Sequence, residues 1–255
     1  MANGVGDEMS IKKIRLDKYL VHVGYGSRSA VQKLIRNKKV KVDEQIIVKP
    51  ETSIDPIHSK VEVNGEEMCY EEFYYFILNK PMGYITATED GRDQTVLDLL
   101  EEQDQNKEVF PVGRLDKDTE GLLILTSNGK MAHRLLSPKQ HVEKVYYAKV
   151  LGRIVEEDII TFESGITLED GTKYEPGKLE IITSGESSEI YVTICEGKFH
   201  QVKRMVQAVG KEVTYLKRVK MGGLELPADL KLGEYRKLTE EELRLLIQGE
   251  SVEND

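Results

Sequence analysis

Two helical patterns open the chain. The first consists of apolar residues at the i, i+3, i+4 and i+7 spacing of an amphipathic helix, namely Leu16, Tyr19, Leu20 and Val23. Gly24 and Gly26 end this helix. Ser27 or Ser29 can cap a second helix. The apolar residues of that second helix are Val31, Leu34 and Ile35. The pattern therefore predicts a pair of short helices at the start of the chain.

Short strand patterns follow the two helices, at residues 40–42, 46–48 and 61–63. Residues 66–73 are acidic and stand between two strand-like segments, which predicts a linker. We therefore expect a small α/β domain over residues 11–68 and a larger domain over residues 73–248.

The larger segment mixes strands and helices irregularly. Strand patterns cover residues 74–79, 84–87, 122–126, 145–151, 178–183, 189–195, 212–219 and 224–226. Helical patterns cover residues 95–102, 129–136, 156–163, 200–209 and 240–248. Because several strands follow one another without a helix between them, we expect an α+β fold with a mixed, mostly antiparallel sheet.

Composition narrows the class of protein. The 255 residues are 39% hydrophobic and 32% charged, which is ordinary for a globular protein with a sizeable core. The two cysteines, Cys69 and Cys195, lie far apart and lack metal-ligand spacing, which favours a reducing cytoplasm and predicts no metal site. No apolar run approaches the roughly 20 residues of a membrane span, and the first ten residues do not resemble a signal peptide.

The charge is unevenly distributed. The net charge is −9, yet residues 11–50 hold eleven Lys or Arg against three acidic residues, and residues 197–220 hold seven against one. Local basic faces on an acidic protein suit binding to a phosphate backbone. On the second helix such a face would comprise Arg28, Gln32, Arg36 and Lys39, although a solvated charged face is the alternative.

A polar loop precedes one of the buried strand patterns. Residues 113–123 read Gly-Arg-Leu-Asp-Lys-Asp-Thr-Glu-Gly-Leu-Leu. Loops held on rigid elements often carry catalytic side chains, but an Asp-rich turn entering a strand is the plainer interpretation. Asp116 and Asp118 could also form a glycosidase pair; we disfavour this because side chains at i and i+2 of an extended loop point apart, and the chain has no Trp.

The segment Glu-Gly-Lys-Phe-His-Gln-Val-Lys-Arg-Met, residues 196–205, leads into a predicted amphipathic helix. Its apolar stripe comprises Phe199, Val202, Met205, Val206 and Val209, and its opposite, polar stripe comprises His200, Arg204, Gln207 and Lys211. Lys203 lies between the stripes, where a cation can reach inward to a buried carboxylate. A solvated lysine is the alternative.

Four segments, in chain order, resemble the motifs of pseudouridine synthases that modify ribosomal RNA. They are Leu-Asn-Lys-Pro-Met-Gly at 78–83, the loop at 113–122, Glu-Lys-Val-Tyr-Tyr-Ala at 143–148, and residues 196–205. Near the N-terminus, residues 15–20, 27–28 and 35–42 resemble the small RNA-binding domain named after ribosomal small-subunit protein four. The resemblance implies an RNA-binding domain followed by a pseudouridine synthase domain.

The resemblance also implies roles for individual residues. Asp116 matches the catalytic aspartate, Tyr146 the aromatic residue that stacks on the base and handles a proton, and Lys203 the paired basic residue, usually an arginine. Without the resemblance, Tyr146 would be taken as core packing. The residues expected to contact RNA are Arg114, Lys80, His200, Gln201, Arg204, Arg28, Gln32, Arg36 and Lys39. No cofactor is expected, since the isomerisation oxidises nothing and consumes no nucleotide.

Further similarity at residues 95–97 and 233–239 favours the branch that acts on small-subunit RNA. The expected activity is isomerisation of one uridine in the decoding-region stem-loop of 16S rRNA, with flipping of the base. The expected partner is this RNA or a small-subunit assembly intermediate, bound by a cytoplasmic monomer. An enzyme acting on 23S rRNA and a non-catalytic rRNA-binding assembly factor are the alternatives.

Overall fold

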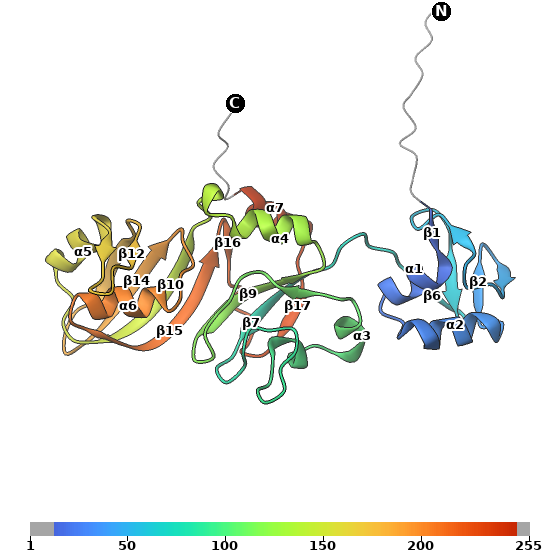
Figure 1. The fold of residues 1–255 in the computed structure, drawn as a ribbon, viewed down its shortest axis with the longest axis horizontal. Coiled ribbons are helices and arrows are strands. Elements are labelled where there is room, and N and C mark those ends of the chain that lie inside the picture. Colours follow the sequence, from blue (N-terminus) through green and yellow to red (C-terminus); the bar gives the residue numbers. More distant parts are fainter. Residues whose placement is uncertain (1–12, 249–255) are drawn as a thin grey trace, which may run out of the picture. The chain divides into compact units, whose positions relative to one another are not determined.

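The computed structural model describes residues 13–248, so the expectations for the first ten residues and for Lys12 lie outside the described part. The described residues form two compact units (Figure 1). Of these residues, the first unit holds 13–72 together with Glu101–Glu108, and the second holds Phe73–Leu100 and 109–248.

In the first unit, two helices cover a four-stranded antiparallel sheet. The helices are α1 Leu16–His22 and α2 Arg28–Arg36. The sheet has the order β3-β2-β5-β6, with β2 Val40–Val42, β3 Gln45–Ile47, β5 Val61–Val63 and β6 Glu66–Met68. A short pair, β1 Ile14–Arg15 and β4 Ser53–Ile54, completes the unit. Ser27 is the cap of α2, and its Oγ accepts a hydrogen bond from Ala30 N at 3.4 Å.

The linker expected at residues 66–73 is wrong in its first part, because β6 begins at Glu66 and pairs with β5. The turn between these strands is Asn64-Gly65, with φ of 53° and 91°. Positive φ at both positions is what a two-residue hairpin of this kind requires. Because Glu66 and Glu67 are both acidic and exposed, β6 does not show the alternation of apolar and polar residues that predicts a strand. The Asn-Gly pair before it was the signal in the sequence that could have predicted the hairpin.

The second unit is built on a nine-stranded sheet with the order β13-β14-β10-β15-β9-β7-β17, with β16 paired to β15 and β8 to β9. Its strands are β7 Tyr75–Lys80, β8 Phe110–Pro111, β9 Glu120–Thr126, β10 Lys144–Leu151, β13 Lys178–Thr183, β14 Ser187–Ile194, β15 Glu212–Met221, β16 Leu224–Glu225 and β17 Tyr235–Lys237. β9 and β15 pair in parallel over two residue pairs, and the other neighbours are antiparallel. The expected α+β fold with a mixed, mostly antiparallel sheet is confirmed.

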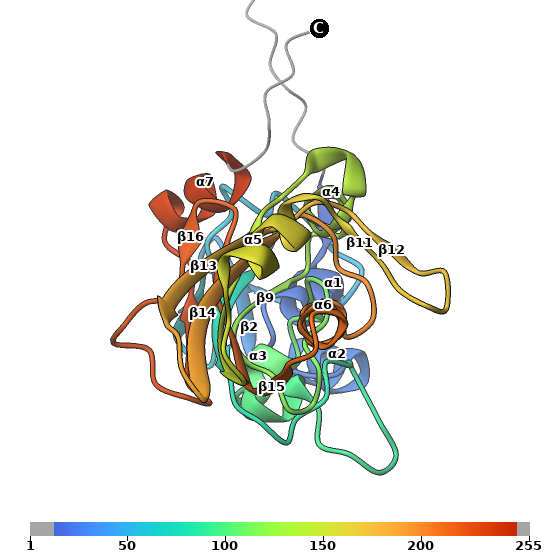
Figure 2. The same cartoon turned by 90° about the vertical axis from the view of Figure 1, so that its left-hand side faces the viewer.

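Both faces of the central strands are buried. Alternate residues of β7 and β9 enter two separate cores, with Phe76 in one and Ile77 in the other. Helices α5 Glu156–Glu163 and α6 Gln201–Ala208 contribute to the first core, and α4 Gly129–Leu136 and α7 Glu240–Gln248 to the second. Figure 2 shows α6 almost end-on beside the strands. The sheet is therefore a middle layer between helices.

Other element predictions failed where segments are short. Residues 84–87 form no strand and make one bridge, between Ile85 and Thr95. The helix expected over 95–102 is instead a 3₁₀ helix, Val96–Leu99, followed by α3 Glu102–Gln105, because the backbone at Leu100 is extended. Strands β8 and β17 and the hairpin of β11 Ile166–Thr167 with β12 Lys173–Tyr174 were missed, since two or three residues show no period.

Candidate active site

The Asp116 loop is held from below by a buried lysine. The Nζ of Lys80, at the end of β7, donates to the carbonyl oxygens of Pro81 at 3.1 Å, Asp116 at 3.0 Å and Thr119 at 2.9 Å. Its side chain is fully buried, and this burial lowers the pKa of Lys80 to about 8. The expectation that Lys80 contacts RNA is therefore corrected: its ammonium group organises the main chain of the Asp116 loop.

The segment after β7 braces the same loop from another side. Gly83 N donates to Lys117 O at 2.8 Å, and the Thr86 hydroxyl donates to Leu115 O at 2.7 Å. Thr86 Oγ1 also accepts from Leu115 N at 3.1 Å. The backbone on both sides of Asp116 is thus fixed while its side chain stays 28% exposed, which is the rigid support that a catalytic group requires.

Lys203 of α6 connects the two aspartates of the loop. Its Nζ lies 3.0 Å from Asp116 Oδ2 and 2.6 Å from Asp118 Oδ1. Burial by itself would lower the pKa of Lys203, but the bonds to Asp118 and Asp116 outweigh it and the pKa is raised. The expectation that these aspartates point apart is wrong, because the loop turns back on itself: Thr119 N donates to Asp116 O at 3.0 Å.

His200 lies closer to Asp116 than its place on the polar stripe suggested. Its Nε2 is 3.5 Å from Asp116 Oδ1, and its ring stacks on Phe199 with centroids 3.8 Å apart. The helix starts only at Gln201, and His200 precedes it with φ of 50° in the left-handed region. The same change of direction leaves Phe199 exposed at 68%, so the apolar stripe begins at Val202, contrary to expectation.

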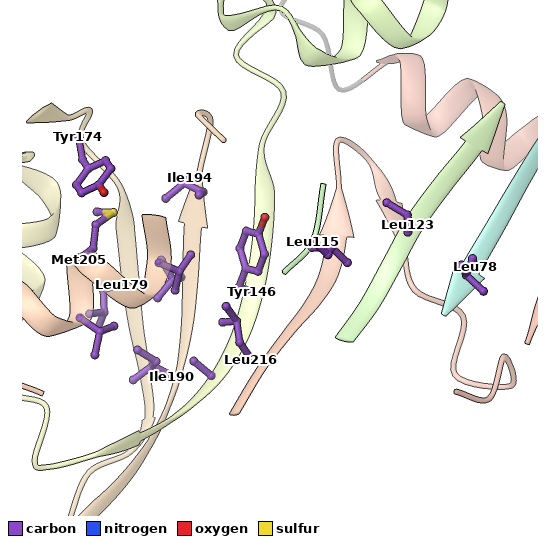
Figure 3. Close-up of a cluster of buried hydrophobic side chains, with 14 of the residues drawn as sticks. Leu78, Leu115, Leu123, Tyr146, Tyr174, Leu179, Ile190, Ile194, Met205 and Leu216 are labelled. Atoms are coloured by element: carbon purple, nitrogen blue, oxygen red, sulfur yellow. The ribbon is translucent and has the colours of Figure 1, made fainter. Parts of the chain in front are cut away.

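A pocket opens beside Asp116. Its apolar wall consists of Leu115, Tyr146, Ile194, Val202 and Leu216. Figure 3 shows the ring of Tyr146 between Leu115 and Ile194. Tyr146 is only 7% exposed, so it belongs to the core and to the pocket wall at the same time. A flat aromatic wall next to a carboxylate can accept a planar base and place the adjoining sugar near the acid.

Other residues expected to contact RNA have differing surroundings. Gln201 is buried; its amide donates to Glu196 Oε2 at 2.9 Å and accepts from Lys198 N at 3.1 Å, so its expected contact with RNA is corrected to a structural role. Arg204 pairs with Asp170. Arg114 is exposed and lines the same pocket as Asp116. Lys211 does not belong to the expected polar stripe either, because its Nζ pairs with Asp158 Oδ1 at 2.6 Å.

In the first unit, the expected basic stripe divides into two parts, one of which is tethered to Asp17. This buried carboxylate accepts from Arg15 at 2.9 Å and from Gln32 at 2.9 Å, and Arg28 lies 3.5 Å away. Burial alone would raise the pKa of Asp17, but these bonds lower it to about 2. The other part consists of Arg36 and Lys39, whose side chains are exposed on the same unit.

Within residues 13–248, no group of three His, Cys, Asp or Glu side chains is placed to hold a metal ion. Over the same range, no helix has the length and apolarity needed to cross a membrane. The side chains at the pocket that can take part in chemistry are the carboxylate of Asp116, the phenol of Tyr146 and the imidazole of His200, with the ammonium of Lys203 next to Asp116.

The comparison with protein families agrees with this fold and with the carboxylate–lysine pair beside the aromatic pocket. The family model described as RNA pseudouridylate synthase matches residues 74–208, more than half of the chain, and the chain belongs to this family. The S4 domain model matches residues 14–56.

Three relatives match over nearly their full length. An uncharacterized RNA pseudouridine synthase of Bacillus subtilis (strain 168) is 50% identical over 93% of this chain and 100% of its own. The ribosomal small subunit pseudouridine synthase A of Escherichia coli (strain K12) is 39% identical over 92% of this chain and 100% of its own. The ribosomal large subunit pseudouridine synthase B of Bacillus subtilis (strain 168) is 38% identical over 91% and 95%.

A solved structure supports the same assignment. The crystal structure of a pseudouridylate synthase, 34% identical, matches with a TM-score of 0.64 over 91% of this chain and 99% of that chain.

Proposed function

We propose that this protein isomerises a uridine of ribosomal RNA to pseudouridine, with Asp116 as the catalytic residue. The observation that carries the proposal is the placement of the Asp116 carboxylate, paired with Lys203 at 3.0 Å, at the edge of the pocket walled by Tyr146. This arrangement puts a carboxylate where the sugar of a bound uridine would lie.

The reaction breaks the bond between C1′ of the ribose and N1 of the uracil, and forms a bond between C1′ and C5. C5 loses a proton and N1 gains one, so no atom or electron is supplied from outside. The carboxylate acts either as a nucleophile at C1′ or as a base at the neighbouring sugar carbon. Both routes require Asp116 to be ionised, and the ammonium of Lys203 lies 3.0 Å from its Oδ2.

Lys203 stands where the family usually has an arginine. One ammonium group binds both Asp116 and Asp118, as a point charge with rotatable donors rather than a planar fork. Charge pairing with Asp116 is thereby retained without a bidentate clamp. Tyr146 supplies a stacking surface for the base, and its hydroxyl can carry a proton during the exchange at C5 and N1.

The target uridine must leave its stack to enter the pocket, because the pocket wall is formed by buried side chains. Flipping a nucleotide costs a few kcal/mol, least in loops and at helix ends, so a structured loop is the favoured substrate. Arg114, exposed at the pocket edge, can fill the vacated space or hold a phosphate.

The similarity to the small subunit enzyme supports a target in small-subunit RNA, and the decoding-region stem-loop of 16S rRNA is the site that the sequence resemblance implies. The similarity to the large subunit enzyme is almost as high, so a site in 23S rRNA is the second candidate. The expected substrate is the folded RNA or a small-subunit assembly intermediate.

Two measurements test the proposal. Purified protein without any added cofactor should release tritium from a 16S transcript labelled at C5 of uridine; no release would leave an rRNA-binding assembly factor instead. Mapping pseudouridines in rRNA from cells that lack the gene then identifies the site. Loss of a single modification in 16S rRNA is expected, and loss in 23S rRNA would overturn the choice of subunit.

A further inference from the structure

A larger cavity adjoins the pocket of Asp116. It has a volume of about 530 Å³, and Arg114, Tyr146, Gly197 and Lys198 line both cavities. The catalytic roles proposed above do not use the inner part of this cavity, where Lys144 and Arg218 lie. A molecule seated next to Tyr146 could thus extend into this space without leaving the protein surface.

The inner part of the cavity holds two buried cations. Lys144 is 7% exposed, and its Nζ donates to the carbonyl oxygens of Val142 at 2.9 Å and Cys195 at 3.0 Å. Arg218 is 2% exposed, its Nε donates to Leu122 O at 2.8 Å, and its buried Nη2 has no hydrogen-bond partner. Burying a charged group without a counter-ion is costly, so this pair calls for an anion.

The lining itself supplies no spare negative charge. Among the residues that border this cavity, all within the described part of the chain, the carboxylate is that of Glu196. Its oxygens are bound by Lys198 Nζ at 2.5 Å, by Gln201 Nε2 at 2.9 Å and by Glu175 N at 3.1 Å. Glu196 therefore neutralises Lys198, and neither Lys144 nor Arg218 has an ionic partner among residues 13–248.

The strands bring the two cations to the same face. Tyr146 of β10 is opposite Arg218 of β15, and Lys144 lies two residues before Tyr146, on the same side of β10. A register shift between Val145 and Tyr146 marks a bulge, a feature that re-aims side chains. Burial, and then the charge of Arg218, lower the pKa of Lys144 to about 8. An anion between them would relieve this repulsion.

We propose that this cavity binds one phosphodiester of the RNA strand, adjacent to the nucleotide whose base stacks on Tyr146. The proposal rests on the proposed function, since the RNA is the ligand of the neighbouring pocket. A phosphodiester is an anion that accepts hydrogen bonds and donates none, which matches a guanidinium and an ammonium group. Because the two cavities share part of their lining, a phosphate of the strand that carries the target uridine can reach this cavity.

The test is a scan of neutral linkages in a synthetic 16S stem-loop RNA. Each phosphodiester near the target uridine is replaced in turn by a methylphosphonate, and the Kd is measured with the Asp116→Asn variant, which prevents turnover. Replacement of one linkage next to the uridine should raise the Kd by about 10-fold or more, as expected for the loss of a charge-assisted hydrogen bond. When Lys144→Gln is added to the Asp116→Asn protein, replacement of the same linkage should raise the Kd no further.

The matched control is Lys149→Gln, an exposed lysine of the same strand outside the cavity, which should leave the linkage effect intact. An equal linkage effect with and without Lys144 would overturn the proposal. Because the scan measures binding alone, its result is independent of tritium release, whose absence would instead defeat the proposed activity.

A second measurement covers the case in which Lys144→Gln disturbs the fold. Cys195 lines the cavity and is partly exposed, whereas Cys69 is exposed elsewhere. In a Cys69→Ser protein with Lys144 intact, bound RNA should slow alkylation of Cys195 by iodoacetamide, and the sensitive methylphosphonate should restore the rate. If inorganic phosphate protects Cys195 from alkylation and no methylphosphonate replacement has an effect, the cavity binds a free anion. That result would overturn the assignment to RNA.

Discussion

Lys203 Nζ and Asp116 Oδ2 are 3.0 Å apart, although 87 positions separate the two residues in the chain. The contact joins α6 to the loop before β9, and it places a positive charge directly on the proposed catalytic carboxylate. The same ammonium group binds Asp118, whose side chain is 70% exposed. The two aspartates thus share a cation but differ in their access to the pocket.

Replacing Asp116 by Asn should lower the rate of isomerisation by on the order of 10³-fold or more, because the amide keeps the size of the side chain and removes the reactive charge. RNA binding should persist. The matched control is Asp118→Asn, which removes the other carboxylate on Lys203 and should retain most of the activity. Substantial tritium release by the Asp116→Asn protein would contradict its assignment.

The Tyr146→Phe variant should keep the fold and the stacking surface but lose the hydroxyl. If that hydroxyl moves a proton, the single-turnover rate falls by about 10² to 10⁴-fold. Tyr147→Phe, one residue along β10 on the opposite face, serves as the control and should be unaffected. Equal rates for Tyr146→Phe and the unaltered protein would reduce Tyr146 to a packing residue.

Lys80→Met should remove the ammonium donor from the carbonyl oxygens of Pro81 and Thr119, and from those of Asp116 and Lys117, which keep main-chain donors of their own. Each unsatisfied buried carbonyl costs about 1–3 kcal/mol, so the melting temperature should fall and the turnover rate should drop more than RNA affinity does. Lys117→Met is the comparison, since that lysine is on the same loop but exposed and paired with Asp93. A normal turnover rate for Lys80→Met would show that the loop does not need this clamp.

The first unit is proposed to hold RNA through exposed cations. Replacing Arg36 and Lys39 by Gln should weaken binding and lower the slope of log K against log salt by about 0.7–0.9 for each phosphate that is no longer neutralised. Arg28→Gln should have a smaller effect, because Arg28 lies 3.5 Å from Asp17. An unchanged salt slope in the double variant would identify this surface as merely solvated.

Asp17 should make the first unit sensitive to acid. Its pKa in the fold is about 2, below the ordinary 3.8, so its contribution to stability is complete above about pH 4 and is lost as the pH falls toward 2. Its partners are partly exposed, which limits the contribution to on the order of 1–2 kcal/mol. Hydrogen exchange of α2 amides should show Asp17→Asn less protected at pH 7, with Glu44→Gln as control; equal protection at pH 7 would contradict the role.

The sequence predicted the fold class and the long elements, since helices such as 129–136 carry a clear period and coincide with the observed bounds. It did not predict how the loop at Asp116 folds back, because that depends on a hydrogen bond from Thr119 and on Lys80 from a distant strand. His200 was misjudged for a local reason: its left-handed backbone takes it out of the helical pattern.

The pair of cations at Lys144 and Arg218 also escaped sequence reasoning. Arg218 stands in an expected strand and Lys144 directly before one, where a charged residue is ordinarily taken as solvent-facing. Their burial follows from the neighbouring strands and from a register shift between β10 and β15. Residues 84–87 carried a strand pattern, yet they brace the Asp116 loop through Thr86 instead.

Gly121 lies where β9 and β15 meet in parallel, directly opposite Arg218, with φ of 105°. A Cβ atom there would lie 2.2 Å from the carbonyl oxygen of Arg218, so the two backbones approach too closely for any side chain. This pairing of β9 with β15 covers only two residue pairs. It connects the strand that follows the Asp116 loop to the strand that pairs with β10, where Tyr146 lies. The position of Asp116 relative to the pocket wall at Tyr146 therefore depends on the lack of a side chain at residue 121, and even the methyl group of an alanine would force these strands apart.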